Sequence, residues 1–253
     1  MQREQAPYFR EGAQLYKGRY VEVMPVLLGD GLTPVSPSDV MQARNNAAGT
    51  QNQDSMWNIY FDTDFGLAAN SKKVYLSPHS KGLRKLTPDT KLKDYGVELS
   101  SVSGAKVFKK GDLKLNTRLT EKEARSHPLW KALAGNQALL DSYVQNAFKL
   151  GKDKFNYDEM MGFYVPNDSK PVLRAVVLDG LGNGSYAGGD GNLGDDDARL
   201  VGVRSNVSSE AANAKNSSQL ESRVLDALKQ GACFNYGGRL YVPVDPKAVQ
   251  KAK

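Results

Sequence analysis

The chain has 253 residues, of which 40% are hydrophobic and 25% are charged, a composition that excludes a disordered or fibrous protein. The formal net charge of +6 favours anionic partners, and the single cysteine excludes an internal disulfide framework. The N-terminus lacks the apolar core of a secretory signal, and no stretch has the length of a membrane span. We therefore expect a cytoplasmic protein without a membrane partner, or an intracellular protein encoded by a virus or mobile element.

The first half of the chain predicts mainly short strands. Residues 19–28 form an apolar, β-branched run that predicts a strand, with Pro25 at an edge or a bend. Ser36 to Asp39 supplies the N-cap chemistry of a short helix. Residues 56–61 predict a second strand, with which residues 74–76 can pair, and residues 77–114 predict short strands and turns.

Helical patterns follow in the middle of the chain. Thr120 and Glu123 have the spacing of a capping box, and Pro128 suits the first position of the next helix. Residues 136–149 place apolar side chains at helical spacing on one face. These patterns predict a central helical block at about residues 120–150.

The last part of the chain returns to strands. Two strand-like runs, 172–179 and 199–204, flank a long connection rich in glycine and aspartate. A second capping box at 218–221 predicts a helix, and Gly237-Gly238 predicts a β-hairpin turn. The whole pattern predicts an α+β fold with a mixed or antiparallel sheet. A composition shift near residue 118 allows a β-rich basic part, 1–118, and an α+β part, 119–253, or one continuous domain.

Charge is divided unevenly along the chain. Residues 70–118 hold twelve Lys or Arg against four Asp or Glu, a local excess of +8, whereas residues 153–197 have a local excess of −6. Cations neutralise phosphates and interspersed aromatic rings stack on bases, so the basic segment predicts a surface for nucleic acid or another polyanion. The candidate binding residues are Lys72, Lys73, Lys81, Arg84, Lys85, Lys91, Lys93, Lys106, Lys109, Lys110 and Lys114.

A second candidate site centres on Asp62-Thr63-Asp64. Alternate side chains of an extended segment share one face, so Asp62 and Asp64 could hold Mg²⁺ or Mn²⁺ for phosphoryl or nucleotidyl transfer or for a nuclease. His79 lies shortly downstream, and Asp179 ends another apolar run. The alternative is structural, with both carboxylates terminating a strand and capping a turn.

The connection between 180 and 197 fits no known phosphate or calcium loop. Ser185 replaces the third glycine of a dinucleotide fingerprint, and no helix follows to bind a pyrophosphate. Asp190, Asn192, Asp195 and Asp197 offer oxygen ligands for a metal, but an EF-hand frame would need glycine at 195. A connection this long either binds a metal, ligand or partner subunit or is simply solvated.

Three functional hypotheses remain from the sequence, which identifies no family. The favoured one is a nonenzymatic binding or assembly protein that engages nucleic acid or an acidic protein partner and needs no cofactor. The alternatives are the metal-dependent transferase and a purely structural, self-assembling subunit. Nucleophilic catalysis lacks support, because Cys233 opens an apolar run typical of a buried thiol and no hydrolase or nucleotide-binding motif occurs.

Overall fold

The computed structural model describes residues 1–6, 8–98, 104–167, 170–189 and 191–204, and the backbone of two short strands near the C-terminus. The chain divides into two units, residues 1–204 and 205–253. In the first unit, strands from both sides of residue 118 share one sheet. The division at residue 118 stays a prediction, and its alternative of one continuous domain is compatible with this shared sheet.

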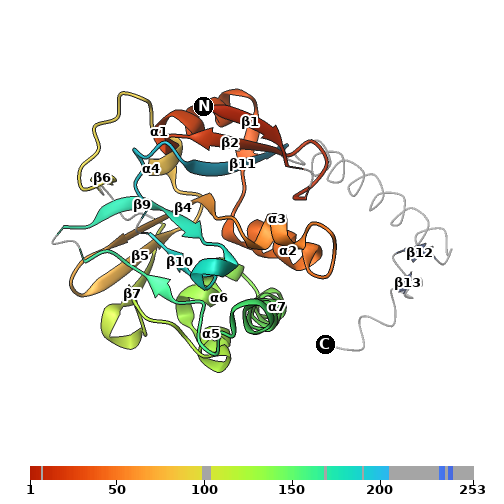
Figure 1. The fold of residues 1–253 in the computed structure, drawn as a ribbon. Coiled ribbons are helices and arrows are strands. Elements are labelled where there is room, and N and C mark those ends of the chain that lie inside the picture. The colour runs from red at the N-terminus through yellow and green to blue at the C-terminus, as the bar shows by residue number, and fades with distance from the viewer. Residues whose placement is uncertain are drawn as a thin grey trace, which may run out of the picture. The chain divides into compact units, whose positions relative to one another are not determined.

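An eleven-stranded mixed sheet forms the centre of the first unit (Figure 1). The main path of the sheet runs in the order β1-β2-β11-β4-β9-β10-β8, while β3, β5, β6 and β7 pair off this path. Strand β11 is parallel to β4 and β10 is parallel to β8, and the other pairs are antiparallel. The strands are β1 (Gln2–Gln5), β2 (Gln14–Gly18), β3 (Leu32–Pro34), β4 (Phe61–Ala69), β5 (Lys73–Ser77), β6 (Val97–Glu98), β7 (Lys106–Lys109), β8 (Phe163–Tyr164), β9 (Val172–Leu178), β10 (Ala187–Gly188) and β11 (Ala198–Arg204).

Seven α-helices accompany the sheet in the described part of this unit, which confirms the predicted α+β class. The central helical block is present as three consecutive helices. They begin at the predicted capping box, at Pro128 and directly after Asn136. The helices are α1 (Tyr20–Gly29), α2 (Pro37–Ala47), α3 (Gln53–Trp57), α4 (Lys81–Arg84), α5 (Glu121–Ser126), α6 (Pro128–Ala134) and α7 (Gln137–Phe155), with 3₁₀ turns at Lys110–Asp112 and Leu181–Asn183.

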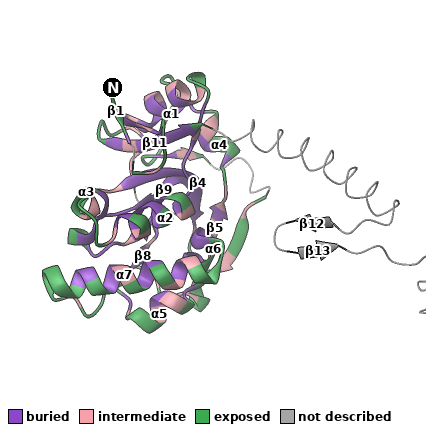
Figure 2. Ribbon diagram, turned by 90° about the vertical axis from the view of Figure 1, so that its right-hand side faces the viewer, coloured by how far each residue is buried: buried purple, intermediate pink, exposed green. Residues whose placement is uncertain are grey.

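The two faces of the sheet belong to different hydrophobic clusters. On β9, Val176 and Leu178 enter the larger cluster with α2, α6 and α7, whereas Leu173 and Ala175 enter the smaller cluster with α1 and α4. This division follows from the alternation of side chains along a strand. Helix α7 accordingly has buried positions on one side and exposed positions on the other (Figure 2). The sheet is therefore covered on both faces, and its central strands are buried throughout.

A fully buried arginine joins the larger cluster to the sheet. The Arg44 guanidinium donates to the carbonyls of Met56, Ile59 and Leu178 and to the Tyr143 hydroxyl, at 2.7–3.2 Å. Every one of these acceptors would lose its donor if Arg44 were removed, so Arg44 fixes α2 against the end of β9.

Strand β4 changes partners along its length. At Asp62 it pairs with β11 and β9, and from Gly66 onward it pairs with β5 and β9. The register to β9 shifts between Asp62 and Gly66, which marks a β-bulge. The segment with the two predicted site carboxylates therefore lies where β11 and β5 diverge on the same side of β4.

Two predicted strands are wrong. Residues 20–29 form helix α1, in which Tyr20, Val23, Met24 and Leu27 are fully buried. An apolar run of this length suits a buried helix as well as a buried strand, and packing decides between them. Residues 53–57 form helix α3, and the strand expected at 56–61 begins only at Phe61, so Asp62 and Asp64 lie within β4 instead of after it.

The second unit is described only by strands β12 (Phe234–Tyr236) and β13 (Arg239–Tyr241), which pair antiparallel as the predicted hairpin requires. The predicted helix after residue 218 and Cys233 lie outside the described residues. Among the helices of the described part of the chain, none combines the length and hydropathy that a membrane crossing needs.

Candidate functional site

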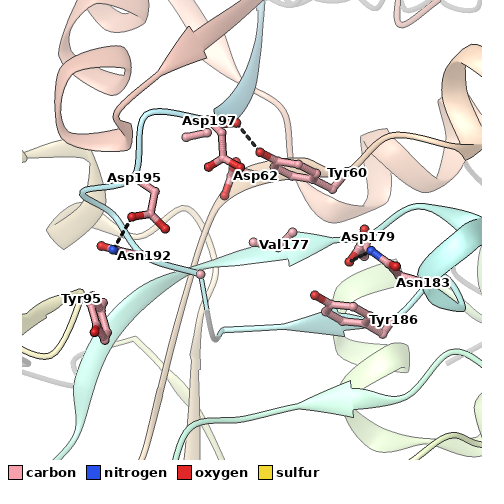
Figure 3. Close-up of a pocket in the computed structure, with 12 residues that line it drawn as sticks. Tyr60, Asp62, Tyr95, Val177, Asp179, Asn183, Tyr186, Asn192, Asp195 and Asp197 are labelled. Atoms are coloured by element: carbon pink, nitrogen blue, oxygen red, sulfur yellow. Dashed lines mark hydrogen bonds between the residues drawn. The ribbon is translucent and has the colours of Figure 1, made fainter.

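A hollow of about 640 Å³ opens on the sheet beside the start of β4 (Figure 3). Its lining contains tyrosine, aspartate and asparagine side chains and, among the described residues, no lysine, arginine or histidine. The lining residues are Tyr60, Asp62, Tyr95, Val177, Asp179, Asn183, Tyr186, Gly191, Asn192, Asp195, Asp197 and Ala198. A second hollow of about 420 Å³ shares Asn183 and Tyr186 with the first and adds Arg118, Tyr164 and Gly182.

Strand alternation explains where the hollow lies. Leu173 and Ala175 of β9 are covered by the smaller cluster, and Val177 and Asp179 continue the same face of the chain. The side chains of Val177 and Asp179 line the hollow and are not covered by helix α1. The hollow is therefore the part of this sheet face that the helical layer leaves open.

Asp179 is positioned by the turn that follows β9. Its Oδ1 accepts from the Gly180 amide at 2.5 Å, and its Oδ2 accepts from Asn183 Nδ2 at 3.1 Å. Gly180 leaves no room for a Cβ, which would lie 2.7 Å from the Asn58 carbonyl oxygen. The glycines that suggested a nucleotide motif thus permit a close backbone approach and a 3₁₀ turn that carries Asn183 to the rim.

The connection between β10 and β11 is anchored by Leu193. This side chain is buried in the smaller cluster, its amide donates to the Tyr95 carbonyl at 3.0 Å, and its carbonyl accepts from the Val21 amide at 3.3 Å. The Asn192 amide group donates to Asp195 Oδ1 at 2.5 Å. The rim residues on either side of Leu193 therefore have a defined backbone, which the sequence did not indicate.

Two parts of the rim have an unusual backbone. Asp94 and Tyr95 have φ values of 49° and 66°, and Ser185, next to Tyr186, has a φ of 50°. Residues other than glycine adopt this left-handed region at a cost, and they do so most often at binding and catalytic sites. The result at Tyr95 is a ring that is 64% exposed although its carbonyl is held by Leu193.

Asp62 occupies the buried end of the hollow. The residue is 7% exposed, and its Oδ2 accepts from the Arg199 amide at 2.8 Å. Burial raises the pKa of its carboxyl to about 7, the nearby Asp197 carboxylate adds to the rise, and the Arg199 amide and side chain oppose it. No cation lies within ion-pair distance of Asp62 among the described residues.

Tyr60 is held beside Asp62. Its hydroxyl donates to the Asp197 carbonyl, and the Arg199 guanidinium carbon lies 4.5 Å from the centre of its ring. Burial, followed by the contact with Asp197, raises the pKa of Tyr60 above its ordinary value. Tyr60 therefore presents a fixed, neutral phenol to the hollow.

Asp64 and His79 form a separate cluster outside this lining. Asp64 is fully buried, and its Oδ2 accepts from both Arg84 and His79 Nδ1, the latter at 3.0 Å. Its Oδ1 is buried without a hydrogen-bond partner among the described residues. The structure thus brings Asp62 and Asp179 to one hollow, whereas Asp64 pairs with Arg84 and shares a hydrogen bond with His79.

The predicted metal ligands do not assemble into a metal site in the described residues. No group of three or more His, Cys, Asp or Glu lies close enough to hold an ion there. Asn192, Asp195 and Asp197 line the hollow, and Asp190 lies outside the described residues.

The predicted polyanion-binding residues lie mostly on exposed positions of β5, β7, α4 and the loops between them. Arg84 is partly buried against Asp64, and Lys114 pairs with Glu123 at 2.8 Å. None of them lines the two hollows.

Sequence reasoning missed the aromatic part of the hollow. Tyr60, Tyr95, Tyr186 and Asn183 come from three separate segments, and only the strand order brings them together. The one available signal was the density of Tyr, Asn, Asp and Gly between 179 and 197, which resembles the composition of binding loops.

Comparison with known proteins identifies the fold. No protein-family model matches the chain, and no curated protein matches it. A solved structure reported as "Accommodation of massive sequence variation in Nanoarchaeota by the C-type lectin fold" is similar, with a TM-score of 0.59 and 13% sequence identity. The match covers 76% of this chain and 96% of that chain. At this identity the similarity concerns the fold alone, and the fold of this chain resembles the C-type lectin fold.

This finding corrects the favoured functional prediction. The similar structure has a C-type lectin fold, and nothing in the comparison supports binding of RNA or DNA or a nucleic-acid assembly subunit. These lysines lie mostly at exposed positions, as lysines do on the solvated surface of a basic protein. The transferase alternative fails as well, since the carboxylates of its motif lie in two different environments. The comparison, which concerns a C-type lectin fold, gives no support to the purely structural subunit. Binding of an acidic protein to the lysines stays a prediction.

Proposed function

We propose that residues 1–204 form a recognition module that binds a ligand in the hollow beside β4. The hollow itself is the main support for this proposal, because it combines about 640 Å³ of open space with tyrosine, aspartate and asparagine side chains from several segments. Loops carried by a rigid scaffold are the usual place for binding residues. Tyrosine and asparagine give contact area and adaptable hydrogen bonds at a modest cost in conformational entropy.

The similar structure adds support at the level of fold. It is described as a C-type lectin fold that accommodates massive sequence variation. A scaffold with this property needs rim segments whose backbone is fixed in part by main-chain hydrogen bonds and core contacts. Leu193 and Gly180 meet that requirement here, which fits a surface whose side chains are available for a ligand.

Ligand screening with matched variants tests the proposal. The full-length chain is screened against a phage-displayed library of random peptides and against a glycan array, and each hit is measured by biolayer interferometry. Tyr95→Ala and Asn183→Ala should each weaken binding about tenfold, because each removes rim contact area. Tyr8→Ala, at an exposed tyrosine that is not among the lining residues, should leave the affinity unchanged. Equal affinities for all three variants would contradict the proposal.

A further inference from the structure

The described lining of the hollow is negatively charged, and this charge limits which ligands can bind. Four carboxylates line it, those of Asp62, Asp179, Asp195 and Asp197, and the described lining contains no basic residue. None of the four makes an ion pair with a described residue. The Arg199 guanidinium lies over the Tyr60 ring, Arg118 borders the second hollow, and Asp197 also borders a further hollow that Lys17 and Arg19 line. The described lining therefore carries an excess of negative charge, which the Arg199 side chain offsets only in part at Asp62, although the chain as a whole is basic.

Asp62 shows why a cationic ligand would be favourable in the hollow. Its carboxylate is nine-tenths buried, faces the hollow, and accepts a hydrogen bond from the Arg199 amide. A buried carboxylate without a cation is costly, and a ligand that supplies one removes this cost. In Figure 3, Asp62, Asp195 and Asp197 lie around one side of the hollow, and Asp179, Asn183 and Tyr186 lie around the other.

The spacing of the carboxylates favours an extended cation over a metal ion. No three described carboxylates or other metal-ligating side chains come close enough to hold an ion. A guanidinium has five N–H donors in a plane and can reach separated carboxylates, and an ammonium has three donors on a flexible stem. Tyrosine rings attract cations to their faces and pack against aliphatic stems, and Tyr60, Tyr95 and Tyr186 provide such rings.

The second hollow indicates a ligand larger than one side chain. It adjoins the first through Asn183 and Tyr186 and carries Tyr164, which packs edge-on against Tyr186 at 5.0 Å. A polypeptide can place one side chain in the first hollow and cover the second with its neighbours. A small free amine would leave the second hollow empty.

We propose, on the basis of the recognition role above, that the hollow binds an arginine or lysine side chain of a protein partner. The cationic head lies among Asp62, Asp195 and Asp197, and the stem packs on the tyrosine rings. The groups that face Asp62 are Asp197 and Arg199 from the β10–β11 segment and β11, Tyr60 before β4, and Tyr20 from α1. Since the pKa of Asp62 is raised to about 7, a bound cation favours its ionised form, and affinity falls as the pH falls through this value.

Peptide selection followed by charge removal tests the inference. Full-length protein is used to select from a phage-displayed library of random peptides, and enriched peptides are synthesised with arginine or with its neutral isostere citrulline, or with lysine or acetyl-lysine. The basic peptide should bind at least about tenfold more tightly than its neutral version. Its affinity should rise about tenfold between pH 6 and pH 8 in the wild type and stay constant in Asp62→Asn.

Control variants separate this inference from the proposed function. Asp195→Asn should weaken binding about tenfold, whereas Asp112→Asn, at an exposed position outside the hollow, should not. Peptides that lose affinity in Tyr95→Ala but tolerate citrulline would overturn the cationic ligand and leave the recognition site in place. Peptides that are insensitive to Tyr95→Ala would remove both proposals. Enrichment of no peptide, or of a neutral glycan that binds the hollow equally at both pH values, would overturn the inference.

Discussion

Asp62 and Asp64 are two residues apart on the same strand and have opposite surroundings. Asp64 is fully buried, forms an ion pair with Arg84 and is hydrogen-bonded to His79. Asp62 is almost as buried, but it faces an open hollow with further carboxylates and no ion-pair partner in the described residues. Two carboxylates that are neighbours in the sequence can therefore differ completely, one paired inside the protein and one facing an open hollow.

The ion pair of Asp64 with Arg84 predicts a large loss of stability when it is broken. Arg84→Met keeps much of the side-chain stem but removes the main cation of the buried Asp64 carboxylate. We expect the free energy of unfolding to fall by about 3 kcal/mol, a value near the lower end for buried pairs because Arg84 is partly exposed. Urea denaturation measures this change.

Arg10→Met is the matched control, because Arg10 is exposed and has no ion pair among the described residues. Its effect should stay within about 0.5 kcal/mol. Similar losses for the two variants would show that the Asp64 cluster contributes little, and the contrast with Asp62 would then disappear.

The buried carboxyl of Asp62 predicts a gain in stability that depends on pH when this carboxyl is replaced. The pKa of Asp62 is raised to about 7 in the folded protein, so wild-type stability is lost as the pH rises from the ordinary carboxyl value through 7. The amide that replaces this carboxyl in Asp62→Asn does not titrate. The stability of Asp62→Asn relative to wild type should therefore increase by about 4 kcal/mol between pH 4 and pH 8. Thermal or urea unfolding across this range measures it, and a constant difference would contradict the assigned surroundings of Asp62.

The smallest expected effect concerns the phenol beside Asp62. Tyr60→Phe removes the hydrogen bond to the Asp197 carbonyl, and we expect a loss of about 1 kcal/mol. Tyr95→Phe is the comparison, since the Tyr95 ring is 64% exposed and its hydroxyl is free to bond with water. Equal unfolding free energies for the two variants would show that Tyr60 is not fixed as described.

Local signals predicted the helical part of the fold well. The capping box at Thr120 and Glu123 and the proline at 128 act within a few residues, so the sequence alone places both helix starts. Residues 20–29 were assigned wrongly because almost every position is apolar, so the sequence hides the helical spacing of the buried Tyr20, Val23, Met24 and Leu27. Met56 and Trp57 were assigned wrongly because they close a helix, α3, that is too short to show a period. The choice between helix and strand there depends on packing against distant segments.

Individual residues of the candidate site could be picked out from the sequence, but their arrangement around one hollow could not. Asp62, Asp179, Asn192, Asp195 and Asp197 were singled out for metal chemistry, and all line the hollow. Their convergence depends on β11 lying beside β4, which no local pattern reports. Tyr60 and Tyr186 escaped notice for the same reason, and Tyr95 was considered only as an aromatic residue of the basic segment, since a lone tyrosine in a loop has no spacing to interpret.

The position of β11 in the sheet also governs the order in which the protein can fold during synthesis. Strand β11 lies between β2 and β4 and connects them in the sheet. The β1-β2 pair and the strands around β4 therefore cannot become one sheet until residues 198–204 leave the ribosome. Pairings so distant in sequence are slow to form, and unpaired strand edges invite association with other chains. A nascent chain that stops before residue 198 should therefore depend on chaperones to stay soluble.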